Sequence, residues 1–191
     1  RPPMDTERQK RLYAEKRKWI YGKILMEDGI CLIENEEGDL LLVESLNSPG
    51  VFISIDGEWQ KAELFDQFAV TEKPETVKLT GGEPIRYLKT VKQAFLEFLN
   101  DLEDGQFYSF LDQLNSLGFS VFDCVFAYNG LSFWPEKKDV KGVSFYQFSH
   151  DMKQCALQHH YERKEEWKDR FEWTASDGER IVMISTFKPP T

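Results

Sequence analysis

One short stretch, CALQHHYERKEEW, brings Cys155, His159 and His160 within six positions of one another. We expect a helix here that begins at His150 with Ser149 as its cap. Helical spacing would put Cys155 and His159 on one face and turn His160 aside. An imidazole beside a thiol can lower the pKa of that thiol and create a nucleophile, and both groups can also bind zinc. The sequence therefore offers one Cys-His pair as a candidate for thiol or metal chemistry.

The surrounding sequence gives this pair little support. A structural zinc site needs about four ligands, and neither Cys-x-x-Cys nor His-Glu-x-x-His occurs in the chain. In the alternative interpretation Cys155 packs in the core, His159 lies at the edge of the apolar stripe and His160 faces water. Thr80-Gly81-Gly82 also lacks the spacing of a phosphate-binding loop. The sequence predicts no metal and no cofactor.

Asp123 is the second candidate for chemistry. It lies within FSVFDCVFAY, for which we expect a strand, and alternation would place Asp123 on the same face as Val121 and Val125. Burial among apolar side chains would raise the pKa of this carboxyl and could make it a general acid or base. The alternative is that Asp123 lies near a strand end or pairs with an arginine, as structural carboxylates often do.

Charge is distributed unevenly along the chain, whose net charge is -9. Residues 1–23 carry eight Lys or Arg and three Asp or Glu, whereas residues 24–77 carry two and thirteen. A narrow amphipathic helix is predicted over residues 6–21. The side chains on it that could contact a partner are Arg11, Lys16, Arg17, Lys18 and Trp19.

A basic helix could bind nucleic acid or an anionic membrane surface. The acidic region that follows would repel a polyanion, and the helix has too few large apolar residues to insert in a membrane. We therefore expect neither partner. Leu12, Trp19 and Ile20 are instead expected to pack on the protein's own sheet or on a second subunit.

Residues 23–64 alternate short apolar runs with turn dipeptides. The dipeptides are Asp28-Gly29, Glu37-Gly38, Pro49-Gly50 and Asp56-Gly57. Asp-Gly between apolar runs is typical of a hairpin, because both central residues of a type I′ turn need positive φ. This pattern predicts an antiparallel meander, and a small SH3-like barrel is one form that it could take.

A helical hairpin is predicted next. Apolar residues recur at spacings of three and four from Ile85 to Leu102, and Pro84 suits a first helical position. The same spacing continues from Phe107 to Leu117, where Gly118 is expected to end the second helix.

The rest of the chain predicts a second antiparallel sheet. Its expected strands cover residues 119–128 and 143–148, with hairpin turns at Asn129-Gly130 and Asp177-Gly178. Strands grouped apart from helices indicate an α+β fold. The turn-rich stretch before residue 84 suggests three parts: a basic helix (1–22), an acidic β-rich domain (23–80) and an α+β domain (81–191). A single continuous globule is the alternative.

Three scattered cysteines, the absence of a long apolar run and the lack of a signal-peptide core predict a cytoplasmic protein. No motif identifies a reaction. Our leading hypothesis is a non-catalytic binding or protein-interaction module, whose partner is a protein, with self-association into a dimer included. The alternatives are a small hydrolase or thiol- or metal-dependent enzyme that uses Cys155, His159 and His160 with Asp123, and a nucleic-acid-associated protein.

Overall fold

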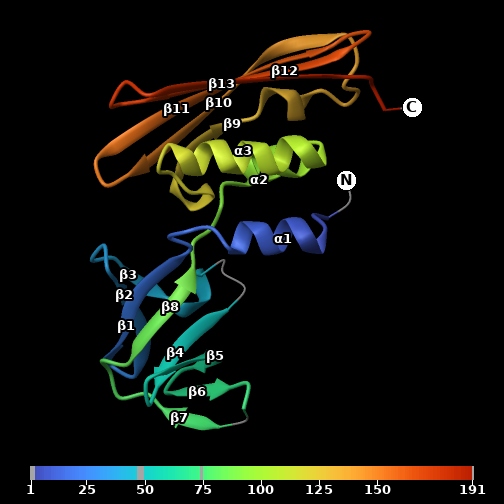
Figure 1. Ribbon diagram of the computed structural model, residues 1–191. Coiled ribbons are helices and arrows are strands. Elements are labelled where there is room, and N and C mark those ends of the chain that lie inside the picture. Colours follow the sequence, from blue (N-terminus) through green and yellow to red (C-terminus); the bar gives the residue numbers. More distant parts are fainter. Residues whose placement is uncertain (1–2, 47–49, 74, 191) are drawn as a thin grey trace. The chain divides into compact units, whose positions relative to one another are not determined.

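The computed structural model describes residues 3–46, 50–73 and 75–190. It has the predicted α+β class, with an N-terminal helix, two antiparallel sheets and two further helices (Figure 1). The chain forms two compact units. Unit 1 consists of Arg1–Lys16 and Val91–Thr191, and unit 2 consists of Arg17–Thr90. No helix among the described residues is long and apolar enough to cross a bilayer.

Unit 1 combines three α-helices with a five-stranded sheet. Its helices and 3₁₀ turns are α1 (Thr6–Tyr13), α2 (Gln93–Asp101), α3 (Asp104–Ser116), η2 (Val121–Asp123) and η3 (Gly130–Phe133). Its strands are β9 (Cys124–Tyr128), β10 (Val140–His150), β11 (Lys153–Arg163), β12 (Trp167–Ala175) and β13 (Arg180–Phe187). They pair antiparallel in the order β13-β12-β11-β10-β9, so consecutive strands are neighbours throughout.

Helices α2 and α3 cover one face of this sheet, which we call the inner face (Figure 1). Phenylalanines of α2 and α3 form the core with the alternate residues of β10, β11 and β12 that point toward them, among them Tyr146, Leu157 and Trp173. Leu12 of α1 joins the same core. The intervening residues form the outer face, on which none of the helices described for unit 1 packs (Figure 1).

Unit 2 is a single eight-stranded antiparallel sheet. Its strands are β1 (Trp19–Glu27), β2 (Ile30–Asn35), β3 (Leu40–Leu42), β4 (Val51–Ile55), β5 (Glu58–Phe65), β6 (Phe68–Thr71), β7 (Thr76–Lys78) and β8 (Pro84–Leu88), and a 3₁₀ turn, η1 (Val43–Ser45), follows β3. The order is β3-β2-β1-β8-β4-β5-β6-β7. Alternate residues such as Ile24, Ile53 and Ile85 form a second core.

The predicted SH3-like barrel does not form among the described residues. The sheet begins at β3 and ends at β7, and neither of these strands pairs with a further strand to close it. The turns themselves are as predicted at Asp28-Gly29 and Asp56-Gly57, where all four residues have positive φ. Pro49 of the predicted Pro49-Gly50 turn lies outside the described residues.

Two helix predictions were too long. Helix α1 ends at Tyr13, Arg17 has a φ of 61°, and Trp19 already begins β1, where aromatic and β-branched residues favour a strand. The helix predicted from Ile85 starts only at Gln93. Residues 84–88 form β8 instead, because a proline is tolerated as the first residue of a strand. Gly118, with a φ of 90°, does follow α3 as predicted.

The helix predicted from His150 was wrong. Asp151 and Met152 both have positive φ and make a tight turn between β10 and β11, although neither is a glycine. The predicted hairpin at Asn129-Gly130 was wrong too. The Asn129 side chain accepts a hydrogen bond from the Ser132 backbone amide and thereby caps η3. The C-terminal hairpin at Asp177-Gly178 is present between β12 and β13.

Candidate functional site

The four residues singled out for catalysis lie in separate environments. Cys155 and His159 do share the inner face of β11, because residues four apart in a strand point the same way. His160 points to the outer face, and Asp123 lies in η2. The structure therefore does not bring the four side chains into one cleft.

Cys155 has the surroundings of a core residue. It is fully buried in the hydrophobic core of unit 1, and burial raises the pKa of its thiol to about 11. A nucleophilic cysteine needs a lowered pKa, which a nearby cation or a helix N-terminus would provide. Among the described residues, no group of three or more His, Cys, Asp or Glu side chains is placed to hold a metal ion.

His159 belongs to a buried polar cluster that we call the Asp169 cluster. Its Nε2 lies 2.7 Å from Asp169 Oδ1, and Arg163 Nη2 donates to the same oxygen at 2.7 Å. Gln106 Nε2 donates to Asp169 Oδ2 at 2.8 Å. Asp169 is only 1% exposed; Arg163 supplies its counter-charge, and His159 and Gln106 supply further hydrogen bonds.

The protonation states of the Asp169 cluster follow from burial and pairing. Burial lowers the pKa of His159 by more than its bond to Asp169 raises it, so the imidazole is neutral near pH 7. Burial alone would raise the pKa of Asp169, but the hydrogen bond from His159 and the charge of Arg163 outweigh it and lower that pKa. An ionised carboxylate only accepts, so His159 Nε2 carries the ring proton.

A cavity beside the Asp169 cluster is too small for a substrate. It has a volume of about 30 Å³ and is lined by His159, Arg163 and Gln106 together with residues of α2, η3 and β13. The buried Nε of Arg163 has no partner among the described residues. Space of this size with one free donor suits about one water molecule. The arrangement fits a structural ionic cluster.

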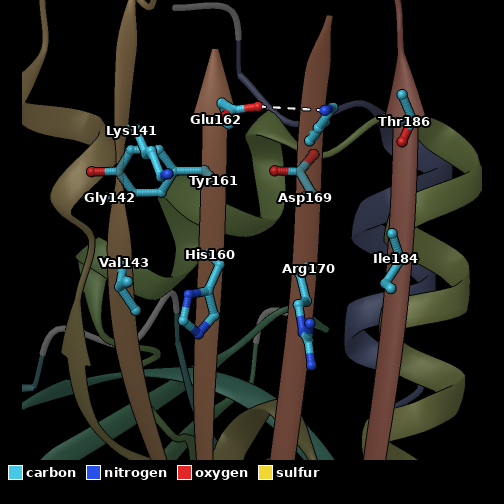
Figure 2. Close-up of a pocket in the computed structure, with 11 residues that line it drawn as sticks. Lys141, Gly142, Val143, His160, Tyr161, Glu162, Asp169, Arg170, Ile184 and Thr186 are labelled. Carbon is cyan, nitrogen blue, oxygen red and sulfur yellow. Dashed lines mark ion pairs between the residues drawn. The ribbon is translucent and has the colours of Figure 1, made fainter. Parts of the chain in front are cut away.

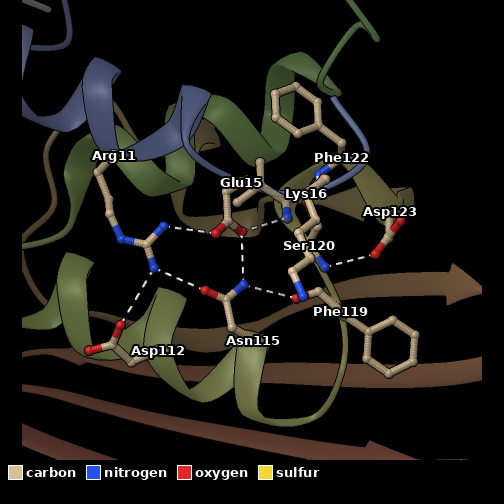
Figure 3. A network of polar contacts seen from close by, with 10 residues as sticks. Arg11, Glu15, Lys16, Asp112, Asn115, Phe119, Ser120, Phe122 and Asp123 are labelled. Atoms are coloured by element: carbon tan, nitrogen blue, oxygen red, sulfur yellow. Dashed lines mark hydrogen bonds and ion pairs between the residues drawn. The ribbon is translucent and has the colours of Figure 1, made fainter. Parts of the chain in front are cut away.

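Asp123 is buried because it caps a turn. Its Oδ2 accepts a hydrogen bond from the Ser120 backbone amide at 2.7 Å, and Ser120 Oγ accepts one from the Phe122 amide at 3.1 Å (Figure 3). The Ser120 side chain also accepts from the Asp123 backbone amide, so Ser120 and Asp123 form a reciprocal capping box. The prediction that Asp123 lies in a strand was wrong, since β9 begins only at Cys124.

Arg11, the residue of α1 in the predicted partner-binding patch, is engaged inside unit 1. Arg11 donates to Glu15 Oε2 at 2.8 Å and to Asn115 Oδ1 at 2.9 Å, and it pairs with Asp112 at 3.5 Å (Figure 3). Glu15 Oε1 accepts from Asn115 Nδ2 and from the Val121 backbone amide, both at 3.0 Å. This network fixes the end of α1 to α3 and η2.

The other members of the predicted partner-binding patch are dispersed. The carbonyl of Lys16 accepts a hydrogen bond from Ser120 Oγ at 2.6 Å in unit 1. Arg17, Lys18 and Trp19 lie in unit 2, where Lys18 Nζ is 5.6 Å from the centre of the Trp19 ring. The basic residues do not form one helical surface, because α1 ends at Tyr13 and the basic stretch continues to Lys18.

A groove of about 310 Å³ crosses the outer face of the unit 1 sheet (Figure 2). His160, Arg170 and Ile184 lie along it on adjacent strands. Lys168 Nζ pairs with Glu162 at 3.7 Å at the same groove. The groove is shallow, and its side chains are those of an ordinary solvated sheet surface.

Large exposed aromatic side chains gather at the β9 end of the same sheet. Phe133 is 72% exposed, Phe126 55% and Trp134 48%. The Tyr128 ring lies 5.9 Å from that of Phe133 and 6.4 Å from that of Phe145 across the β9-β10 pair. We call these side chains the aromatic surface: Phe126, Tyr128, Phe133, Trp134 and Phe145.

The sequence interpretation missed this surface. FSVFDCVFAY is apolar on both alternating faces and LSFW follows Asn129-Gly130, a pattern that predicts the hairpin of a buried sheet. The available signal was the polar loop PEKKDVKG directly after Trp134, which is typical of an exposed segment.

Comparisons with known proteins give a family but no activity. The chain is 50% identical over 180 residues to the uncharacterized protein YisN of Bacillus subtilis (strain 168), an alignment that covers 94% of this chain and 92% of that protein. No solved structure matches the chain. The model of a family described as a protein of unknown function, DUF2777, matches residues 6–185, and the chain therefore belongs to the DUF2777 family.

Proposed function

We propose that this protein is a non-catalytic interaction module that binds a protein partner through the aromatic surface of unit 1. The observation that carries the proposal is the exposure of five aromatic side chains on β9, β10 and the segment between them, three of which lie together around Tyr128. Contiguous exposed apolar patches on a folded protein mark interaction sites, and Tyr, Trp and Phe are enriched in interfaces.

The strand that carries part of this surface supports the same proposal. Among the described strands, β9 pairs only with β10, so its second edge has no partner strand. Its sequence, CVFAY, contains no charged residue of the kind that protects edge strands from pairing. An extended segment of a partner could add to this edge while its side chains contact the aromatic rings. The partner can be another protein or a second copy of this chain.

The catalytic alternative has less support. Cys155 and Asp123 are committed to packing and capping, and the cavity at His159 has room for about one water molecule. The nucleic-acid alternative loses its proposed surface, because Arg11 is engaged within unit 1 and α1 ends at Tyr13.

A cytoplasmic location belongs to the same proposal. The three cysteines, Cys31, Cys124 and Cys155, are all free, which suits a reducing compartment. Fractionation of cells that produce the tagged protein would test this location. Recovery of most of the protein outside the cytoplasmic fraction would contradict it.

The interaction itself is tested with matched pairs of substitutions on one sheet. Phe133→Ser with Trp134→Ser removes part of the aromatic surface, and Val182→Ser with Ile184→Ser removes exposed apolar side chains at the opposite edge. Each tagged variant is purified from cells, and the co-purifying proteins are quantified. Sedimentation velocity of the purified variants measures self-association.

We expect either a co-purifying protein or a dimer of this chain. The wild type and the double variant at Val182 and Ile184 should retain it, and the double variant at Phe133 and Trp134 should lose it. The candidate partner is then purified and its affinity measured, with a loss of about tenfold or more expected for the aromatic variant. Equal binding by all three proteins would contradict the proposal.

A further inference from the structure

A second cluster with the composition of a binding surface lies on unit 2. Arg86 of β8 is opposite Tyr21 of β1 and Phe52 of β4 on the sheet face that points away from the unit 2 core. Its guanidinium carbon lies 4.1 Å from the centre of the Trp19 ring and 4.7 Å from that of Trp59. We call these five residues the arginine clamp.

The guanidinium of the arginine clamp has aromatic neighbours and no acidic partner. Within the described part of the chain, Arg86 forms no hydrogen bond or ion pair, and its Nε is buried without a partner. Unit 2 has fourteen Asp and Glu residues against eight Lys and Arg, so the missing acidic partner does not reflect a shortage of carboxylates in this unit. An arginine held between rings is oriented in advance and retains its hydrogen-bond donors for an external acceptor.

The rings restrict how a ligand can reach Arg86. Trp19 and Phe52 meet edge to face at 5.1 Å, and Tyr21 lies 6.0 Å from Trp59, so the aromatic side chains support one another around the cation. Tyr21 is 44% exposed, while Trp19, Phe52, Trp59 and Arg86 are half-buried. A ligand would therefore meet the guanidinium at its edge, with apolar ring surface on either side.

We propose that the arginine clamp binds an aspartate or glutamate side chain of a protein partner, with apolar residues on either side of that acidic residue. A carboxylate matches the planar fork of a guanidinium, and the rings would contact the flanking apolar side chains. Trp, Tyr and Arg are also the residue types that dominate binding energy in protein interfaces. A nucleic acid fits less well, because the net negative charge of unit 2 repels a polyanion.

This inference is independent of the aromatic surface, which lies on unit 1. The arginine clamp accounts for two of the residues that the sequence had suggested for partner binding: Trp19, which is part of it, and Lys18, whose Nζ lies over the Trp19 ring. If experiments show that one of the two surfaces binds no partner, the proposal for the other surface still stands.

A displayed library of random twelve-residue peptides, selected on the immobilised full chain, tests the proposal. The same selection is run on Arg86→Lys, which keeps the positive charge and loses the fork, and on Arg180→Lys, a matched change at an exposed arginine of unit 1. Circular dichroism confirms that each variant is folded. The best peptide is synthesised and titrated by tryptophan fluorescence, and a fifteen-residue oligothymidylate is titrated in parallel.

We expect enriched peptides that contain Asp or Glu between apolar residues. Arg86→Lys should weaken the best peptide about 30-fold, and replacement of its acidic residue by the amide should do the same, whereas Arg180→Lys should change the affinity less than about threefold. The proposal would be overturned if the peptides enriched on the wild type but not on Arg86→Lys lack an acidic residue, or if the best peptide binds Arg86→Lys with equal affinity. Tighter binding of the oligothymidylate at the same clamp would overturn it in favour of a phosphate ligand.

Discussion

The inner and outer faces of the unit 1 sheet use the same residue types for different purposes. His159 and His160 are adjacent in β11, but one is 2% exposed beside Asp169 and the other faces solvent 3.6 Å from Glu172. A strand turns successive side chains to opposite faces, so one step along the chain separates core from surface. Reactive residue types close together in sequence therefore need not share a site.

Asp169 on the inner face and Glu172 on the outer face show how solvent changes the role of a carboxylate. Asp169 has a side chain that is 1% exposed and is held by buried donors. Glu172, 18% exposed, lies within 2.6 to 3.6 Å of Arg170, Arg180 and His160, whose side chains are 41 to 58% exposed. Water screens the outer group and lets each partner be replaced, whereas the inner group has no substitute for a lost partner.

The largest expected effect is the loss of Asp169. Asp169→Ala would leave Arg163 buried without a counter-ion, and we expect it to lower the free energy of unfolding by about 3 to 5 kcal/mol. Glu172→Ala, the matched change on the outer face, should cost less than about 1 kcal/mol. Urea denaturation followed by tryptophan fluorescence measures both. Equal losses of unfolding free energy in the two variants would contradict the difference between the two faces.

A smaller effect is expected at the end of α1. Glu15 has a side chain that is 3% exposed and accepts from Arg11, Asn115 and the Val121 amide, so Glu15→Ala should cost about 2 to 3 kcal/mol. Glu7→Ala removes an exposed acid of the same helix and should cost less than about 0.5 kcal/mol. Hydrogen exchange of the α1 amides should rise only in the Glu15 variant, and unchanged exchange there would contradict its anchoring role.

Burial of His159 predicts that stability depends on pH. The pKa of His159 is lowered below its ordinary value of 6.5 in the folded protein, so the unfolded chain binds a proton first as the pH falls. Stability should therefore decrease from about pH 7 downward, by at most about 1.4 kcal/mol per pH unit, until the folded pKa is passed. His159→Gln should flatten unfolding curves measured between pH 7.5 and 5. His160→Gln, the same substitution at the next residue of β11, serves as the control, and equal flattening by both substitutions would contradict the prediction.

Substitution on the exposed face should have the smallest effect. Ile184 is 66% exposed beside the outer groove, and Ile184→Thr should change the free energy of unfolding by less than about 0.5 kcal/mol. Thermal unfolding of the variant and the wild type measures the difference. A loss above about 1 kcal/mol would mean that another part of the molecule, or a second copy, covers this face.

Much of the fold was predictable where local chemistry determines it. The turns at Asp28-Gly29 and Asp56-Gly57 and the helix end at Gly118 all depend on residues that tolerate positive φ. The turn at Asp151-Met152 uses the same backbone conformation without glycine, and so it gave no signal. The Cys155-His159 spacing then fitted a helix equally well, because four residues return to the same face in both structures.

The candidate sites were less predictable, because composition does not show which side chains the rest of the protein covers. An aromatic run such as the one ending at Tyr128 has the same composition whether its sheet is covered on one face or on two. Only the packing of α2 and α3 on one side determines that the other side faces solvent. The arginine clamp was equally hidden, because Trp19, Trp59 and Arg86 come from three separate strands.

The way in which unit 2 interrupts unit 1 makes the chain divisible. The Lys89 amide donates to the Lys18 carbonyl at 2.7 Å, so the chain enters and leaves unit 2 at neighbouring positions. A loop of about two to five residues could therefore replace residues 18–89 and reconnect α1 to the rest of unit 1. The excised segment would likewise have its two ends side by side, as transplantable inserted domains do.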